Sequence, residues 1–175
     1  MKKLKINSFF AFLLFCLAIS WLKSSTVIAQ PKPELFVFFD VECPICQNYT
    51  NKLQKLYNEF GKEVNFKLIY PTKGTTTKMV RAFEKEYGFK IPYLIDEAHQ
   101  AVKKYNASTT PEVFLVKNGE IIYNGMIDNQ FIGLGKFRPK TSEYYLKDAL
   151  EALKNDQIVS VKKTEPVGCL INHHF

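Results

Sequence analysis

The sequence predicts an α/β protein, a three-layer sandwich in which helices cover both faces of one mixed β-sheet. Three observations carry this prediction. Strand-like and helix-like segments alternate over residues 34–105, two strands then flank Asn118-Gly119, and one more helical segment follows. Alternating strands and helices favour parallel pairing, whereas Asn-Gly between two apolar runs is the strongest short signal for an antiparallel hairpin. The expected order is β-α-β-α-β-α-β-β-α.

The first half of the domain begins with a continuous apolar run at 35–39, which predicts a central strand buried on both faces. A helix is expected from Pro44, a residue suited to the first helical position, to a stop at Gly61. Its apolar face is Ile45, Tyr49, Leu53, Leu56 and Phe60. Residues 64–70 alternate as a second strand, and a helix capped within 75–77 should then end at Gly88.

The second half contains shorter elements. Residues 91–96 form a strand whose early proline places it at a strand start or an edge, and 98–105 form a short helix. The hairpin pairs 112–116 with 121–123. Thr141 or Ser142 is expected to cap a last helix. The inward-facing residues of that helix are Tyr145, Leu146, Ala149, Leu150 and Leu153.

Residues 1–29 have the features of a secretory signal peptide. The chain starts Met1-Lys2-Lys3-Leu4-Lys5, continues through an apolar stretch at 9–22 and reaches a small residue at Ala29. A basic start, a short apolar middle and a small residue before the cleavage point are typical of such signals. The alternative is an uncleaved anchor, although the stretch falls just short of the roughly 20 residues that span a bilayer. We expect a periplasmic or extracytoplasmic protein with, at most, transient membrane attachment through this segment.

The charge of the chain lies largely in this N-terminal segment. The formal net charge is +7, and removal of 1–29, which holds four lysines and no acidic residue, leaves +3. Charge therefore gives no reason to expect a nucleic-acid partner. Residues 30–155 are long enough for one domain with a hydrophobic core. Residues 156–175 have little periodicity and are expected to form a C-terminal tail.

The sequence Cys43-Pro44-Ile45-Cys46 joins the first strand to the first helix. A thiol at a helix N-terminus meets unpaired backbone N–H groups and the positive end of the helix dipole, which makes it reactive. We expect Cys43, as the more exposed thiol, to attack a disulfide and the more buried Cys46 to resolve the mixed disulfide. The other interpretations are a structural disulfide or half of a metal site, but the chain has no second Cys-x-x-Cys to complete a zinc site.

The Cys-x-x-Cys together with Thr110-Pro111 before the hairpin resembles the thioredoxin-like superfamily. Within it, the chain is similar to the exported redoxin branch, either the alkyl hydroperoxide reductase/thiol-specific antioxidant (AhpC/TSA) group or the TlpA-like group, and to a peroxiredoxin-like subgroup. The motifs that carry this likeness are Glu42-Cys43-Pro44-Ile45-Cys46-Gln47-Asn48-Tyr49-Thr50, Thr110-Pro111-Glu112-Val113-Phe114, Asp128-Asn129 and Pro166-Val167-Gly168-Cys169. They lie within residues 34–170.

The resemblance implies a thioredoxin-like fold and a thiol–disulfide oxidoreductase. It implies that Pro111 is cis, that it packs against the cysteine pair and keeps metals off it, and that Thr110 and Pro111 present their backbone to a substrate. It implies no cofactor beyond the redox-active Cys43–Cys46 disulfide. The expected partners are protein dithiol or disulfide clients and a membrane thiol reductase that donates electrons.

Two positions depart from the thioredoxin pattern, which has tryptophan directly before the first cysteine and an acidic residue six positions before it. This chain has Glu42 and Val37 there. Asp40 and Glu42 become the candidate acid–base groups. Because negative charge raises the pKa of a nearby thiol, we expect Cys43 to be less acidic than in strongly oxidising exported thioredoxins, with a reducing poise.

Cys169 is a third cysteine downstream of the predicted signal. One interpretation is that the tail brings it to Cys43 or Cys46 as an auxiliary redox thiol. The other is a spare thiol without a role.

Two further functions compete with disulfide exchange. A thiol peroxidase using Cys43 would need a threonine three residues earlier and a supporting arginine, but Asp40 occupies that position and the only arginines are Arg81 and Arg138. A copper-binding or delivery module would use Cys43 and Cys46 with a histidine. The candidate histidines are His99, His173 and His174. We expect no metal site.

Overall fold

The computed structural model describes residues 31–172. The signal or anchor predicted for 1–29 and the histidines His173 and His174 lie outside the described residues. Within the described part, none of the helices is long and apolar enough to cross a membrane.

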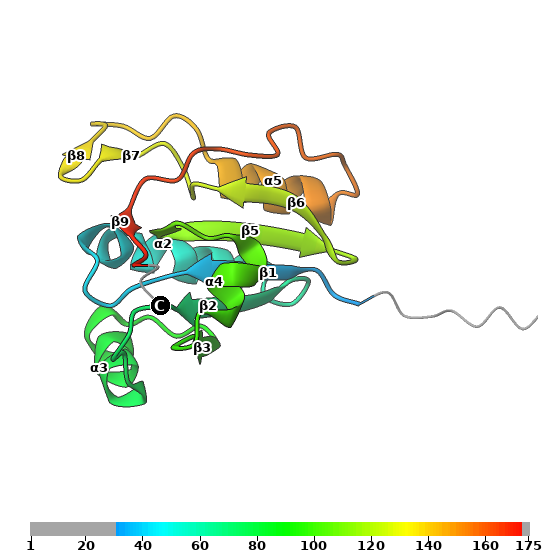
Figure 1. Ribbon diagram of the computed structural model, residues 1–175. Coiled ribbons are helices and arrows are strands. Elements are labelled where there is room, and N and C mark those ends of the chain that lie inside the picture. The colour runs from blue at the N-terminus through cyan, green and yellow to red at the C-terminus, as the bar shows by residue number, and fades with distance from the viewer. Residues whose placement is uncertain (1–30, 173–175) are drawn as a thin grey trace, which may run out of the picture. The chain divides into compact units, whose positions relative to one another are not determined.

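The centre of the fold is a five-stranded mixed sheet with the order β3-β2-β1-β5-β6. The strands are β1 (Glu34–Phe38), β2 (Asn65–Tyr70), β3 (Tyr93–Ile95), β5 (Glu112–Lys117) and β6 (Glu120–Gly125). β1 pairs in parallel with β2 and antiparallel with β5, while β5 and β6 form the hairpin predicted around Asn118-Gly119. This mixed sheet, with β1 at its centre, confirms the predicted fold class (Figure 1).

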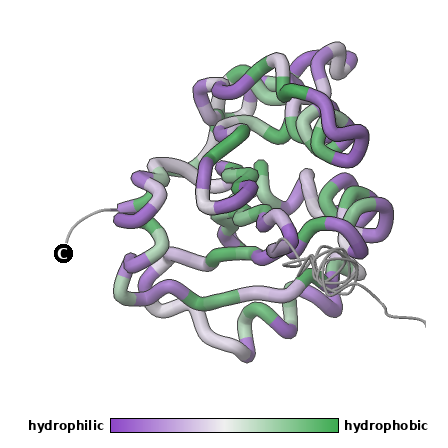
Figure 2. The backbone as a smooth tube through the Cα atoms, turned by 90° about the vertical axis from the view of Figure 1, so that its right-hand side faces the viewer, coloured by the Kyte–Doolittle hydropathy of each residue, from purple (hydrophilic) through white to green (hydrophobic). Residues whose placement is uncertain are grey.

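Helices pack on both faces of this sheet. They are α2 (Pro44–Phe60), α3 (Thr77–Tyr87), α4 (Gln100–Tyr105) and α5 (Tyr145–Lys154). Side chains of β1 alternate between two cores: Leu35 and Val37 join one with α2, α3 and α5, and Phe36 and Phe38 join the other with α4. This alternation explains why the β1 run is apolar throughout. Figure 2 shows hydrophobic (green) and hydrophilic (purple) stretches alternating along the chain, as expected for elements with one buried side.

The ends of the helices largely follow the local sequence. The Thr76 side chain accepts a hydrogen bond from the N–H of Met79 and caps α3, which ends at Gly88 with φ 59°. The prediction for α5 was wrong, because its N-cap is Tyr144 and neither Thr141 nor Ser142 caps it. The Ser142 hydroxyl instead accepts a hydrogen bond from the side chain of Asn129 (2.8 Å). A tertiary contact therefore uses the polar group that was expected at the helix start.

Four short strands were not predicted. β7 (Phe131–Gly133) pairs with β8 (Lys136–Phe137), and β4 (Thr109–Thr110) pairs with β9 (Cys169–Leu170). The segment predicted as a C-terminal tail, 156–175, falls within the compact unit that starts at Pro31. Val159 and Ile171 are both buried, so this segment contributes to the cores. The four short strands leave no periodic pattern in the sequence, because each has only two or three residues.

Candidate active site

The connection from β1 to α2 places the cysteine pair at one end of the central strand. Cys43 is the N-cap residue of α2, and its side chain makes no capping hydrogen bond. Pro44 follows in the first turn, where its missing N–H and fixed φ suit a helix start. The Cys43 carbonyl accepts the first helical hydrogen bond from Gln47 (3.0 Å). The Cys43 thiol therefore lies at the positive end of a 17-residue helix.

Both cysteines of the pair are buried. Cys43 exposes 2% of its surface and Cys46 exposes 0%, so Cys43 is the more exposed of the two, as predicted, although both are nearly covered. The Cys43 thiol donates a hydrogen bond to the carbonyl oxygen of Thr110 (3.3 Å). The Cys46 sulfur accepts one from the backbone N–H of Asp40 (3.4 Å). Each sulfur thus has a different backbone partner.

Thr110 and Pro111 form the other wall of the site. The peptide bond between them is cis, and it lies between β4 and β5. The loop before it is held by the buried Glu112, whose carboxylate accepts hydrogen bonds from the backbone N–H groups of Ser108 (2.7 Å) and Thr109 (3.2 Å). Glu112 thus fixes the two residues that precede the carbonyl in contact with Cys43. The sequence signal for this role was an acidic residue at the start of an otherwise apolar strand.

The pKa values of the two thiols are shifted in opposite directions. The pKa of Cys43 is lowered from 9.0 to about 5, chiefly by a hydrogen bond from the Cys46 side chain, against the opposing effect of burial. Hydrogen bonds from the side chain and backbone of Cys169 lower it further. Burial raises the pKa of Cys46 well above its ordinary value, and the negative charge of Cys43 raises it further. The lowered pKa favours the thiolate form of Cys43, whereas the raised pKa favours the protonated form of Cys46.

Asp40 and Glu42, the predicted acid–base candidates, differ in their surroundings. The Asp40 carboxylate accepts hydrogen bonds from the Thr72 hydroxyl and from the N–H of Glu42 (2.8 Å). Glu42 is exposed. The groups that shift the pKa of Cys43 are its neighbouring cysteines and not these two carboxylates, whereas the charge of Asp40 raises the pKa of Cys46. Of the two carboxylates, only that of Asp40 acts on a thiol of the pair, and that thiol is the buried Cys46.

Cys169 also reaches this site. β9 pairs antiparallel with β4, and Cys169 lies opposite Thr110 in the register. Burial raises the pKa of Cys169 to about 12, and a hydrogen bond with Cys43 adds to the shift. Cys43, Cys46 and Cys169 are all free thiols. The structure therefore brings Cys169 to the cysteine pair, from which more than a hundred residues separate it in the sequence.

A buried polar cluster that sequence reasoning missed supports α2 beside the cis peptide. The Tyr49 hydroxyl donates to the buried Asp128 carboxylate (2.6 Å), which also forms an ion pair with Lys52. Tyr49 and Asp128 line a small cavity together with Pro111 and Val167. The signal in the sequence was weak, because Tyr49 and Asp128 lie far apart along the chain.

Tyr49→Phe should therefore lower the free energy of unfolding by about 1–3 kcal/mol, because the buried Asp128 carboxylate loses a hydrogen-bond donor. Urea denaturation measures the change. Tyr87→Phe is the matched control, since Tyr87 is only half-buried and stacks on Phe83 through its ring, which phenylalanine retains. Equal stabilities of the two variants would contradict a structural role for the Tyr49–Asp128 contact.

The residues considered for a metal site or a peroxidase site have other partners. Within residues 31–172, no three His, Cys, Asp or Glu side chains are grouped so as to hold a metal ion. The ring Nε2 of His99 lies 2.7 Å from the carbonyl oxygen of Pro71. The Arg138 side chain donates to the carbonyl oxygen of Asn129 (3.1 Å).

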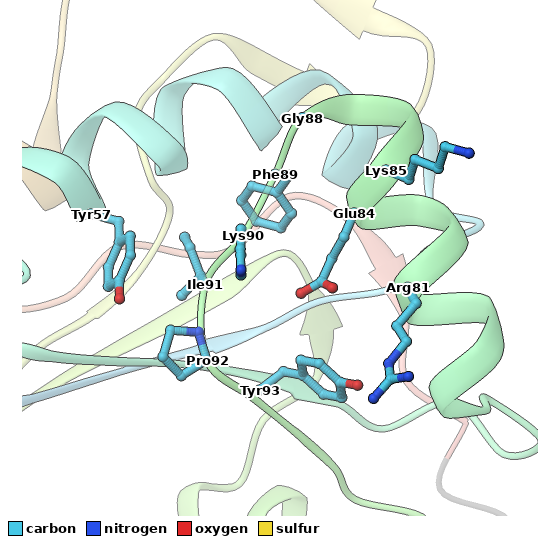
Figure 3. Close-up of a pocket in the computed structure, with 10 residues that line it drawn as sticks. All are labelled: Tyr57, Arg81, Glu84, Lys85, Gly88, Phe89, Lys90, Ile91, Pro92 and Tyr93. Atoms are coloured by element: carbon cyan, nitrogen blue, oxygen red, sulfur yellow. The ribbon is translucent and has the colours of Figure 1, made fainter.

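A large cavity lies apart from the cysteines. It has a volume of about 1030 Å³ and is lined by α3, by the segment after it and by Tyr57 of α2 (Figure 3). Arg81 is among its lining residues, and no cysteine is.

The mixed sheet, the helices on both faces and the cysteine pair at the end of the central strand define a thioredoxin-like protein. Residues 10–124 match the AhpC/TSA family, and the chain belongs to that family.

Curated relatives include two proteins named thiol-disulfide oxidoreductase ResA. The one from Bacillus thuringiensis subsp. konkukian is 32% identical over 89 residues, which are 49% of this chain and 49% of that protein. The one from Halalkalibacterium halodurans is 28% identical over 86 residues, 49% of this chain and 48% of that protein. The chain therefore spans about half the length of the curated relatives it matches.

Solved structures extend the similarity over more of the fold. A hypothetical protein from Sinorhizobium meliloti 1021 is 26% identical, with a TM-score of 0.69 over 79% of this chain and 78% of that chain. StoA from Bacillus subtilis is 20% identical, with a TM-score of 0.50 over 74% and 84% of the two chains. A secreted Mycobacterium tuberculosis disulfide oxidoreductase homologous to E. coli DsbE is 16% identical, with a TM-score of 0.52 over 70% and 83%. The last two bear on the fold alone.

Proposed function

We propose that this protein is an exported thiol–disulfide oxidoreductase that exchanges electrons with protein disulfides through Cys43 and Cys46. The observation that carries the proposal is the opposite acidity of the two thiols: the pKa of Cys43 is lowered to about 5, and that of the buried Cys46 is raised. In a pair of this kind, the thiolate attacks the client disulfide and the protonated thiol later resolves the mixed disulfide. The similarity to proteins named thiol-disulfide oxidoreductase supports the same activity.

The reaction begins when the Cys43 thiolate attacks one sulfur of a client disulfide. A bond forms between Cys43 Sγ and that sulfur, the client disulfide breaks, and the second client sulfur leaves as a thiolate that takes up a proton. Cys46 then loses its proton and attacks Cys43 Sγ, which releases the first client thiol and leaves a Cys43–Cys46 disulfide. The client gains two electrons, and the protein loses two. A dithiol donor, which we propose to be a membrane thiol reductase, restores the pair.

The backbone of Thr110 is the proposed docking edge for the client. Its carbonyl faces the Cys43 thiol, and the backbone groups of β4, which pair with β9 in this structure, can pair with an extended client segment once β9 leaves. No cofactor other than the cysteine pair takes part. Export is proposed from the basic and apolar character of 1–29.

Insulin-disulfide reduction with dithiothreitol as donor tests this proposal. The full chain should accelerate insulin precipitation, and Cys43→Ser should return the rate to the uncatalysed level because no other described thiol has a lowered pKa. Cys16→Ser is the matched control and should retain the rate. Retention of activity in Cys43→Ser would contradict the mechanism, and hydrogen peroxide consumption that depends on Cys43 would assign the protein to the peroxidases instead.

Asp40 is the proposed proton acceptor for Cys46. Its backbone N–H contacts the Cys46 sulfur, and its negative charge acts on the pKa of that thiol. Asp40→Asn should slow the formation of the Cys43–Cys46 disulfide from a mixed disulfide by about 10²-fold, the lower range for a general base. Stopped-flow measurement with a small mixed disulfide provides the rate. Glu42→Gln, at the exposed neighbour, should change it less, and an equal loss in both variants would contradict the assignment.

A further inference from the structure

The C-terminal segment is attached to the domain on both sides of Cys169. Before it, the Thr164 N–H donates to the carbonyl oxygen of Asn124 (3.0 Å), and the Thr164 hydroxyl accepts from the N–H of Met126 (2.8 Å). After it, the Ile171 N–H donates to the carbonyl oxygen of Ser108 (2.9 Å), and the Ile171 side chain is buried. The strand that carries the third cysteine is therefore docked at defined points.

Between these attachments the strand passes directly over the cis peptide. Cys169 is the register partner of Thr110, and a Cβ atom at position 168 would overlap the Thr110 carbonyl group. Only glycine allows so close an approach. Figure 1 shows β9 (red) beside the N-terminal end of α2, where the cysteine pair lies. β9 thus occupies the edge of β4 that an extended client would use.

The Cys43 sulfur consequently has two thiol neighbours. Hydrogen bonds from the side chains of Cys46 and Cys169 both act on it. The two neighbours differ in access, because Cys46 is fully buried whereas Cys169 is half-buried. Both thiols therefore lie close enough to Cys43 to be candidates for attack on it once it is oxidised.

We propose that Cys169 is a second resolving cysteine and that β9 is an internal occupant of the client edge. Starting from the Cys43–Cys46 disulfide, the Cys169 thiolate attacks Cys43 Sγ. The Cys43–Cys46 bond breaks as the Cys43–Cys169 bond forms, and Cys46 leaves as a thiolate that takes up the proton lost by Cys169. The step is an isomerisation of one disulfide with no net oxidation, so it needs no further reactant.

This exchange gives the oxidised protein two forms. With the bond at Cys43–Cys46, β9 is held only by non-covalent contacts and can leave the edge of β4. With the bond at Cys43–Cys169, β9 is covalently fixed across that edge and a client cannot pair there. This consequence for clients rests on the proposed function, whereas the disulfide itself does not.

The test is to oxidise the full-chain Cys46→Ser protein with oxidised glutathione and map its disulfides by mass spectrometry. Cys16→Ser is included in every variant so that only two cysteines remain. Glutathione first couples to Cys43, and Cys169 should then displace it to give an intramolecular Cys43–Cys169 disulfide in most chains, because a docked thiol acts at high effective concentration. Chains with glutathione on Cys43 and a free, alkylatable Cys169 would overturn the proposal.

Two variants show whether the docking of β9 is required. Gly168→Ala should lower the linked fraction about tenfold or more, because its Cβ overlaps the Thr110 carbonyl and lifts the strand. Gly133→Ala is the matched control, since its nearest neighbour is an ordinary contact at 3.9 Å, and it should leave the linked fraction unchanged. If Gly168→Ala fails to fold, Thr164→Val, which removes the hydroxyl bonded to Met126, tests the same attachment. Equal linkage in the docking variants and the control would overturn the role of β9.

This experiment contains no client protein, so its result is independent of the proposed function. A protein that reduces insulin but forms no Cys43–Cys169 disulfide retains its function and refutes the second resolving cysteine. A protein that forms this disulfide but reduces no client disulfide supports the inference and refutes the proposed function.

Discussion

Cys46→Ser/Cys169→Ser is expected to convert the protein into a trap for its client. Attack by Cys43 needs only the Cys43 thiolate, but release of the mixed disulfide requires a second thiol next to Cys43 Sγ. With both resolving thiols replaced, as in Cys46→Ser/Cys169→Ser, the mixed disulfide should persist in the absence of external thiols. Pull-down from the extracytoplasmic fraction, elution with dithiothreitol and mass spectrometry would then identify the bound proteins.

The matched control for this trap is Cys43→Ser/Cys169→Ser, which retains Cys46 and the same number of cysteines. It should capture nothing, because Cys46 is fully buried and the pKa of its thiol is raised. The single variant Cys46→Ser should release its client faster than the double variant, since Cys169 still contacts Cys43. Equal capture by the Cys43 and Cys46 variants would show that the roles of the two thiols are not those assigned here.

The reactivity of Cys43 should follow a pKa of about 5. In the reduced full chain, the rate of alkylation of Cys43 by iodoacetamide should rise with pH to a midpoint near that value and be constant near neutrality, whereas an unperturbed thiol has its midpoint at about pH 8.5. Mass spectrometry of the Cys43 peptide isolates the rate from that of the other cysteines. A midpoint in the ordinary range would contradict the hydrogen-bonded thiolate.

Both neighbouring thiols should affect the pH midpoint of Cys43 alkylation, and Cys46 should have the larger effect. The hydrogen bond from Cys46 is the largest cause of the lowered pKa of Cys43, and that from Cys169 is smaller. Cys46→Ala should therefore raise the midpoint more than Cys169→Ala. Because the pKa of Cys43 is lower in the folded state than in the unfolded state, its contribution to the stability of the reduced protein is complete above about pH 9 and is lost as the pH falls through about 5. Thermal melting of the reduced protein across this window measures that loss.

Much of the fold could be predicted because its signals are local. The apolar run of β1, the stripe of α2 ended by Gly61 and the Asn118-Gly119 hairpin each occupy a single stretch of sequence. A strand buried on both faces must be apolar throughout, and a helix with one buried side must repeat with its turn. These constraints act on adjacent residues, so the order of the elements can be read without the tertiary structure.

The active site was only partly predictable. Cys43 and Cys46 share one motif and were found, but the burial of Cys43 was not, because the strand beside it comes from the far end of the chain. Glu112 and the Tyr49–Asp128 contact were also missed as supports of the site. A buried polar pair leaves no periodic pattern, since its partners are chosen by proximity in space.

The order of the elements and the place of the cysteine pair at a strand-to-helix connection followed from the sequence alone, because both depend on short-range periodicity and helix geometry. The tertiary structure was needed for the contribution of Cys169 to the acidity of Cys43, for the bond between Asp40 and Thr72, and for the position of Cys169 opposite Thr110. The physical reason is that these properties arise from contacts between segments far apart in the chain. A two-residue strand such as β9 is specified by the surface on which it docks and not by its own composition.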